Sequence, residues 1–292
     1  TAPHPPNVIH EPYYSMYDKD NIPEPITPEW AEDKNAPYFE YRRKWRTSPG
    51  PMKDSELKKA RSVYYGQVTH LDHELGKLFG RLIDEGIWDD TIIIYTSDHG
   101  EKLGDYGSFW KGSFVDSSAR IPFIFKGSDL FNITSHTSKA LVTLTDILPT
   151  LCDILNIKIP EGITGRSIMD IILKKKNRVR NYLYGNFNNV IHMIHDGKYK
   201  YIYYVEDGKE LLFDIKEDRE EKYDLSNNKN LIKEKRNILI DHLKKINHEH
   251  VKDNKLISND LSKPSRDELK KMAIKSSGLA WAGRSFTKVL KE

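Results

Sequence analysis

A long amphipathic helix followed at once by a buried strand constrains the fold of this 292-residue chain more than any other feature. Between Asp54 and Glu85, apolar residues recur at gaps of three and four, which is the spacing of one helix face. Residues 91–96 then form an uninterrupted β-branched and apolar run, typical of a strand covered on both faces. A second such strand is predicted over 121–125, and a further helix over 146–155. This order predicts an α/β fold with a mostly parallel sheet flanked by helices.

The segments on either side of this core differ from it in composition and in hydrophobic periodicity. Prolines recur through residues 1–50 and exclude a long helix, so we expect an ordered loop region there. Beyond residue 181, short aromatic-rich runs separated by Asp-Gly turns predict a small antiparallel sheet, with strands over 182–186, 190–195, 199–205 and 210–214. A polar helix over 230–248 and a basic tail, with Trp281 as its expected anchor, follow. We therefore predict an α/β domain over residues 1–178 and a carboxy-terminal subdomain over residues 179–292.

Composition excludes several classes of partner. The 46 basic residues nearly balance the 43 acidic ones, and a net charge of +3 indicates no nucleic-acid binding. We interpret the Lys174-Lys175-Lys176 run as solvated surface rather than as a polyanion site. No run approaches the roughly 20 apolar residues of a membrane span. The single cysteine cannot form an internal disulfide. The high content of Lys, Asn and Ile suggests a bacterial origin. Localisation stays open, and a periplasmic or secreted protein is one option.

The pair Asp98-His99 is the clearest candidate for chemistry. It follows the strand of residues 91–96, and ligands of open α/β sheets bind at the carboxyl ends of strands. A carboxylate beside an imidazole offers one oxygen and one nitrogen donor to a divalent ion, and Gly100 lets the chain turn sharply. The alternative is a capped turn, in which Asp98 accepts backbone amides and His99 is merely exposed.

Several short motifs surround this pair in a fixed order. They are Leu71-Asp72, Leu75-Gly76, Asp90-Thr91, residues 96–101, Leu103-Gly104-Asp105, Trp110-Lys111 and Arg120-Ile121-Pro122. Over residues 64–125 the chain closely resembles the formylglycine-dependent sulfatases and their relatives in the alkaline phosphatase superfamily. Weaker similarity extends the resemblance to roughly residues 1–235, through Pro3-His4-Pro5-Pro6, residues 145–151, 197–201 and 210–214. The fold that this implies is alkaline-phosphatase-like, with residues 1–178 as the later part of the sulfatase-like α/β domain.

The resemblance also implies roles for four residues. Asp98 and His99 match metal ligands. Calcium is usual in the sulfatases, which often have Asn at the position of His99, whereas a histidine shifts the preference toward manganese or zinc. Calcium is therefore the first expectation, with manganese or zinc as alternatives. Lys111 matches a lysine that contacts the sulfate, and His4 matches a histidine that touches the sulfate and can protonate the leaving oxygen. The alternatives are an ordinary surface lysine and a loop histidine.

Two departures from the family pattern limit what these residues can do alone. Tyr106 stands where the family often has histidine. No Cys/Ser-x-Pro/Ala-x-Arg motif, the source of the formylglycine nucleophile, occurs in the sequence, and Cys152 is predicted to be a packed helix residue. We therefore expect the formylglycine, the remaining metal ligands and an amino-terminal partner segment to lie outside this chain. The chain would then be a carboxy-terminal portion that is inactive alone, because catalytic metal sites usually need three or more ligands.

Three functions remain open at this point. The first is a sulfuric ester hydrolase that acts on a small-molecule or glycan sulfate ester. The second is a phosphodiester or phosphonate monoester hydrolase on the same scaffold, an option that His99 supports. The third is a non-catalytic binding protein with the same fold. The substrate itself is not readable, since specificity would lie in residues 7–50 and in the tail.

Overall fold

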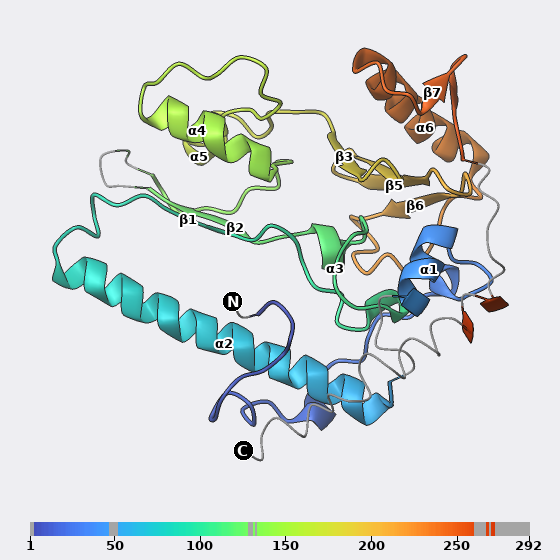
Figure 1. Cartoon of the computed structure of the whole chain (residues 1–292). Coiled ribbons are helices and arrows are strands. Elements are labelled where there is room, and N and C mark those ends of the chain that lie inside the picture. The colour runs from blue at the N-terminus through green and yellow to red at the C-terminus, as the bar shows by residue number, and fades with distance from the viewer. Residues whose placement is uncertain are drawn as a thin grey trace.

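A computed structural model describes residues 3–46, 52–127, 131, 133–259, 267–268 and 270–271. The predicted anchor Trp281 and most of the predicted helical tail lie outside the described residues. The described residues combine helices with three small sheets: β1–β2, β3–β4–β5–β6 and β7–β8. Figure 1 shows the long helix α2 along one side, the β1–β2 pair beyond it, and the four-stranded sheet with α6 at the upper right.

The helix and strand that dominate the sequence pattern are present. Helix α2 spans Asp54–Asp84, and strand β1 spans Ile93–Thr96. Strand β2, Phe123–Lys126, pairs with β1 in antiparallel register, so the described residues contain no parallel pair. The expected burial of β1 on both faces is wrong for these residues, because all of β1 is only half-buried. Among the described strands β1 has β2 as its one neighbour, which leaves it incompletely covered.

Residues 3–46 are ordered, as expected, but they include a helix that the proline pattern did not indicate. Helix α1 spans Tyr38–Arg46 and follows Pro37, a residue that is compatible with the start of a helix. Short 3₁₀ turns at Lys19–Asn21 and Glu29–Ala31 precede it. The segment runs close to α2, where the Tyr17 hydroxyl lies 2.7 Å from the Thr69 hydroxyl.

The carboxy-terminal sheet is the best-packed part of the molecule. Its strands are β3 (Leu183–Phe187), β4 (Ile191–His195), β5 (Tyr199–Tyr204) and β6 (Glu210–Asp214), all antiparallel as predicted. One face packs against helix α6, Lys229–Lys245, through a cluster that includes Leu239 and Leu243. The other face packs against the N-terminal region and the loop after β1, through Trp30, Phe39 and Tyr106. This second cluster joins the two predicted units, and the boundary at residue 178 stays a prediction.

The remaining elements are short. A 3₁₀ turn at Leu144–Asp146 leads into α4, Ile147–Ile154, where the sequence predicted a helix. The others are the 3₁₀ turn Asp105–Gly107, α3 (Asp116–Ala119), α5 (Met169–Ile172), β7 (Val251–Lys252) and β8 (Lys255–Leu256). Helix α5 covers β2, with Ile168 to Ile172 packed on Phe123 and Phe125. None of the described helices combines the length and the apolar character needed to cross a bilayer.

Candidate functional site

Asp98 and His99 lie just beyond the carboxyl end of β1, where the sequence pattern places them. The Asp98 carboxylate accepts the His99 backbone amide through Oδ1 at 2.9 Å, which leaves Oδ2 directed at the His99 ring. His99 Nε2 lies 3.3 Å from that Oδ2 atom. The Asp98 side chain is 80% exposed, so the pair opens to solvent.

The hydrogen bonds of Asp98 and His99 orient their free donor atoms toward a common point where a cation can bind. His99 Nδ1 lies 2.9 Å from the Gly100 carbonyl oxygen, which can only accept, so Nδ1 carries the proton in the neutral ring. The lone pair of Nε2 then faces the Asp98 carboxylate oxygen. The two electron-rich atoms repel each other unless a proton or a cation lies between them. Two ligands bound at right angles, about 2.1–2.4 Å from one ion, stand about 3.0–3.4 Å apart. The 3.3 Å separation therefore fits a divalent ion, and a carbonyl partner on the far nitrogen is usual for metal-binding histidines.

The structure brings Lys111 and His4 together beside this pair, although 107 positions separate them in the sequence. Lys111 Nζ lies 3.1 Å from His4 Nε2, and the His4 and His99 ring centroids are 6.5 Å apart. His4 Nδ1 lies 2.7 Å from the Pro5 carbonyl oxygen, so the neutral ring carries its proton there and accepts an N–H from Lys111 at Nε2. All four predicted site residues thus belong to one locality, while their roles stay predictions.

Two further residues hold Lys111 in place, and the sequence alone did not indicate a functional role for either. The Glu101 carboxylate accepts the backbone amides of Leu103 and Trp110, which closes the loop that presents Lys111. The Arg43 guanidinium donates to the Lys111 carbonyl oxygen, and burial lowers the pKa of Arg43. Glu101 stands inside the sequence motif and could have been identified by its proximity, whereas Arg43 lies on α1 and carries no local signal.

Close backbone contact explains the glycine after the ligand pair. A Cβ at Gly100 would lie 2.2 Å from the Ser117 carbonyl oxygen, and the Gly100 amide donates to the Ser118 carbonyl at 2.8 Å. Any side chain at this position would push the ligand turn away from α3. The glycine is therefore required by packing as well as by the turn.

Buried ion pairs fasten the same loop to the rest of the molecule. The Lys102 ammonium is buried, 3.0 Å from the Glu40 carboxylate of α1, and the Tyr204 hydroxyl of β5 donates to the other oxygen of that carboxylate. Tyr106, which departs from the family pattern, is also buried. Its hydroxyl donates to Glu221 at 3.2 Å, and burial raises the pKa of Tyr106 well above the usual range. Tyr106 is thus a packing residue in this chain.

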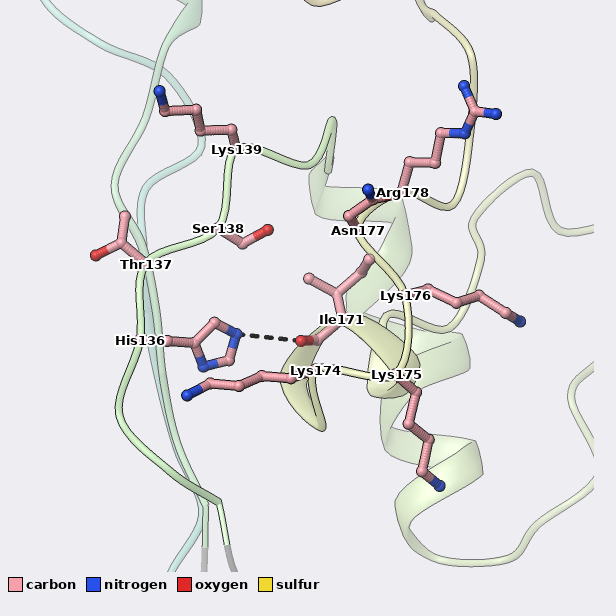
Figure 2. A pocket seen from close by; sticks show the side chains of 10 residues that line it. All are labelled: His136, Thr137, Ser138, Lys139, Ile171, Lys174, Lys175, Lys176, Asn177 and Arg178. Carbon is pink, nitrogen blue, oxygen red and sulfur yellow. Dashed lines mark hydrogen bonds between the residues drawn. The ribbon is translucent and has the colours of Figure 1, made fainter.

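Other groups considered in the sequence lie elsewhere. Cys152 is buried in α4, as expected of a core residue. A depression lined by His136, Lys139 and the Lys174-Lys175-Lys176 run contains none of the predicted site residues. Figure 2 shows Lys139, Lys175 and Lys176 pointing in different directions, and the Lys176 ammonium is paired with Asp170 at 2.6 Å. This divergence favours the interpretation as solvated surface.

Two family models match the sequence. The model described as "Sulfatase" matches residues 1–157, more than half of the chain. The model described as "N-sulphoglucosamine sulphohydrolase, C-terminal" matches residues 104–250. The two matches overlap across the loop that carries Lys111.

Curated relatives extend the similarity over most of the chain. An arylsulfatase of Clostridium perfringens is 33% identical over 250 residues, which is 84% of this chain and 50% of that protein. The multifunctional alkaline phosphatase superfamily protein PehA of Trinickia caryophylli is 29% identical over 251 residues, covering 75% of this chain and 49% of that protein. The chain therefore spans about half the length of these curated relatives.

Solved structures confirm the predicted fold class as alkaline-phosphatase-like α/β. The phosphonate monoester hydrolase SpPMH from Silicibacter pomeroyi has a TM-score of 0.72 at 24% identity, covering 83% of this chain and 54% of the other. The structure of BT4656 in complex with its substrate D-glucosamine-2-N,6-O-disulfate has a TM-score of 0.60 at 23% identity, covering 66% and 42%. At these identities the likeness concerns the fold alone.

Proposed function

This chain belongs to the sulfatase family of the alkaline phosphatase superfamily, and we propose that its protein hydrolyses sulfate esters at the locality of Asp98, His99, Lys111 and His4. One observation carries this proposal: Lys111 Nζ and His4 Nε2 stand 3.1 Å apart beside the Asp98-His99 pair. A cation site next to an ammonium and an imidazole is suited to an oxyanion that gains charge on its leaving oxygen.

Asp98 Oδ2 and His99 Nε2 would hold a divalent ion, which as a Lewis acid would polarise the ester oxygens. Calcium is the first candidate from the family, and the imidazole donor favours manganese or zinc. Two donors are too few for a catalytic ion. We therefore propose that further ligands and a formylglycine nucleophile come from outside residues 1–292, and that these residues alone show no turnover.

Lys111 and His4 would have different roles in the reaction. The Lys111 ammonium would neutralise charge on the ester oxygens, and Glu101 and Arg43 keep its loop in place through backbone hydrogen bonds. An incoming oxyanion would compete with His4 for the Lys111 N–H. Released from Lys111, His4 Nε2 would take up a proton from solvent and pass it to the leaving oxygen, while the Nδ1–H stays bonded to the Pro5 carbonyl.

The substrate class we propose is a small-molecule or glycan sulfate ester. The arylsulfatase of Clostridium perfringens and the sulfated sugar in the BT4656 structure support this class without distinguishing its members. A phosphodiester or phosphonate monoester is the second candidate. His99 supplies the nitrogen donor that favours a transition metal, and the phosphonate monoester hydrolase from Silicibacter pomeroyi shares the fold.

The test compares esters and variants in the full-length protein. Initial rates on an aryl sulfate, an aryl phosphodiester and an aryl phosphonate are measured with calcium, manganese or zinc added after chelation. Asp98→Asn and His99→Asn are the site variants, and His73→Asn, an exposed histidine on α2, is the matched control.

The expected result is cleavage of aryl sulfate that falls at least about 100-fold in Asp98→Asn and is unchanged in His73→Asn. His99→Asn should retain activity with calcium and lose it with zinc, because an amide oxygen suits the harder ion. Faster cleavage of a phosphorus ester would select the second candidate. No cleavage of any ester, with no metal retained, would leave the non-catalytic binding protein as the correct description.

A further inference from the structure

Three histidines meet at the edge of the carboxy-terminal sheet. They are His192 on β4, and His248 and His250 in the turn between α6 and β7. One ring nitrogen from each lies within 4.8 Å of the other two. In the part of the chain that the structure describes, this is the one group of three or more such donors that converges in this way.

The geometry of the group is close to that of a metal site. His192 Nε2 lies 2.8 Å from His250 Nδ1, and the three ring centroids are 4.8 to 5.1 Å apart. Two nitrogens bound at about 2.0–2.1 Å to a tetrahedral zinc ion stand about 3.3 Å apart. To place all three nitrogens on one ion, the 2.8 Å pair would open by about 0.5 Å and the widest pair would close by up to about 1.5 Å.

The surroundings of His192 resemble those of a metal ligand. The Tyr184 hydroxyl lies 3.0 Å from His192 Nδ1 and can accept its proton, which leaves the lone pair of Nε2 directed at the cluster. His192 and His250 are 0% and 6% exposed.

His248 is the member held most loosely by the protein itself. Its Nδ1 accepts the His250 amide at 3.2 Å, at the long end of the ordinary range, and its Nε2 lies 3.4 Å from the Asn186 side-chain nitrogen, beyond that range. Both contacts come from N–H donors, whereas a neutral imidazole has only one lone pair to accept them. The His248 ring can therefore reorient at little cost.

We propose that His192, His248 and His250 bind a divalent transition-metal ion of the zinc class, which fastens the α6–β7 turn to strand β4. Three imidazole nitrogens select zinc, cobalt, nickel or copper over calcium and magnesium, which prefer oxygen. A water molecule would complete a tetrahedral set. This site is separate from the Asp98-His99 pair and does not depend on the proposed hydrolysis.

The test uses cobalt(II) as a spectroscopic probe in the full-length protein. The background carries Asp98→Asn and His99→Asn, so that loss of hydrolysis and loss of this site are scored separately. Metal-free protein is titrated with Co²⁺, following the visible absorption and the bound equivalents by dialysis. The cluster variants are His248→Ala, in the half-buried turn, and Tyr184→Phe. His136→Ala is the matched control, since His136 is exposed and outside the cluster.

We expect one tightly bound Co²⁺ that excess Ca²⁺ does not displace, and a melting temperature that rises with Co²⁺. Tyr184→Phe should bind Co²⁺ about 10–100-fold more weakly. His248→Ala should lose the absorption band and the thermal response, and His136→Ala should keep both. Absence of Co²⁺ binding in the background protein, displacement by Ca²⁺, or equal binding by His248→Ala would each overturn the proposal and leave a metal-free packed histidine cluster.

Discussion

Replacing Lys200 with methionine tests whether a buried charge network fastens the two predicted units together. The Lys200 ammonium is 3% exposed and lies 2.8 Å from the Glu221 carboxylate, which is fully buried. It also pairs with Asp116 at the start of α3. The opposing carboxylates outweigh the effect of burial and raise the pKa of Lys200, so the group is charged at every pH at which the protein is handled.

The expected loss is about 3 kcal/mol, the low end of the 3–5 kcal/mol typical when one partner of a buried pair is removed. The low end applies because Glu221 keeps two hydrogen bonds, from the Asp116 amide at 2.6 Å and the Tyr106 hydroxyl at 3.2 Å. Burial raises the pKa of Glu221, and without Lys200 that pKa rises further. Below its folded pKa the carboxyl takes up a proton and the penalty shrinks, so the loss should be smaller at pH 5 than at pH 8.

Urea unfolding of the full-length protein, followed by tryptophan fluorescence, measures the loss. Trp30 is a suitable reporter because its indole N–H donates to the Glu221 carbonyl at 2.6 Å. Adding Glu221→Gln to Lys200→Met should recover at least about 1 kcal/mol, since the fully buried Glu221 charge is then removed and Asp116, which also loses the ammonium, keeps its ion pair with Arg120. Lys158→Met, at an exposed pair with Glu161, is the control and should stay within about 0.5 kcal/mol of wild type. A Lys200→Met loss below about 1 kcal/mol, or no recovery in the double variant, would refute the reasoning.

Three smaller predictions concern the site and the sheet. Lys111→Met should reduce kcat/KM on the ester that the full-length protein cleaves by about 100- to 1000-fold, with an unchanged urea midpoint; an unchanged kcat/KM would remove Lys111 from the site. Glu101→Ala should cost about 1–3 kcal/mol of stability together with activity, whereas Glu101→Gln, which keeps an acceptor for the Trp110 amide, should retain most of both in the same assays. Burial and then the charge of Lys200 lower the pKa of His195 in the folded state, so the contribution of His195 to stability should fall as pH drops below about 6.5, by at most about 1.4 kcal/mol per pH unit. Urea midpoints from pH 5 to 8 should show this slope flattened in His195→Gln, and an unchanged slope would contradict the assignment.

Local patterns predicted the elements whose residues interact with near neighbours. Helix α2 begins at Asp54 as its periodicity requires, and the Asp-Gly turns place the strands of the carboxy-terminal sheet within about one residue. The antiparallel β1–β2 pairing could not be predicted in this way, because strand direction depends on which segments meet in space. Helix α1 was missed because the prolines around it dominate the local composition.

The candidate site was predictable only in part, for a related reason. Asp98 and His99 are adjacent, so their shared position at a strand end can be read directly from the sequence. The meeting of His4 with Lys111 across 107 positions has no local signal, and only the family resemblance suggested it. The histidine group at the sheet edge was equally hidden: the turn shows His248 and His250, but His192 lies 58 positions before His250.

The contacts around Glu221 imply that the carboxy-terminal sheet contributes to the site, although none of its residues is predicted to touch a substrate. Glu221 accepts the Tyr106 hydroxyl on one side of the Lys111 loop and the Asp116 amide on the other. Lys200 of β5 neutralises it from within the sheet. The loop that carries Lys111 is therefore held at both ends by a single buried carboxylate, whose charge the sheet balances. The boundary at residue 178 stays a prediction, but the Lys111 loop before it and the sheet after it share this carboxylate, so a substitution at Lys200 should alter catalysis as well as stability.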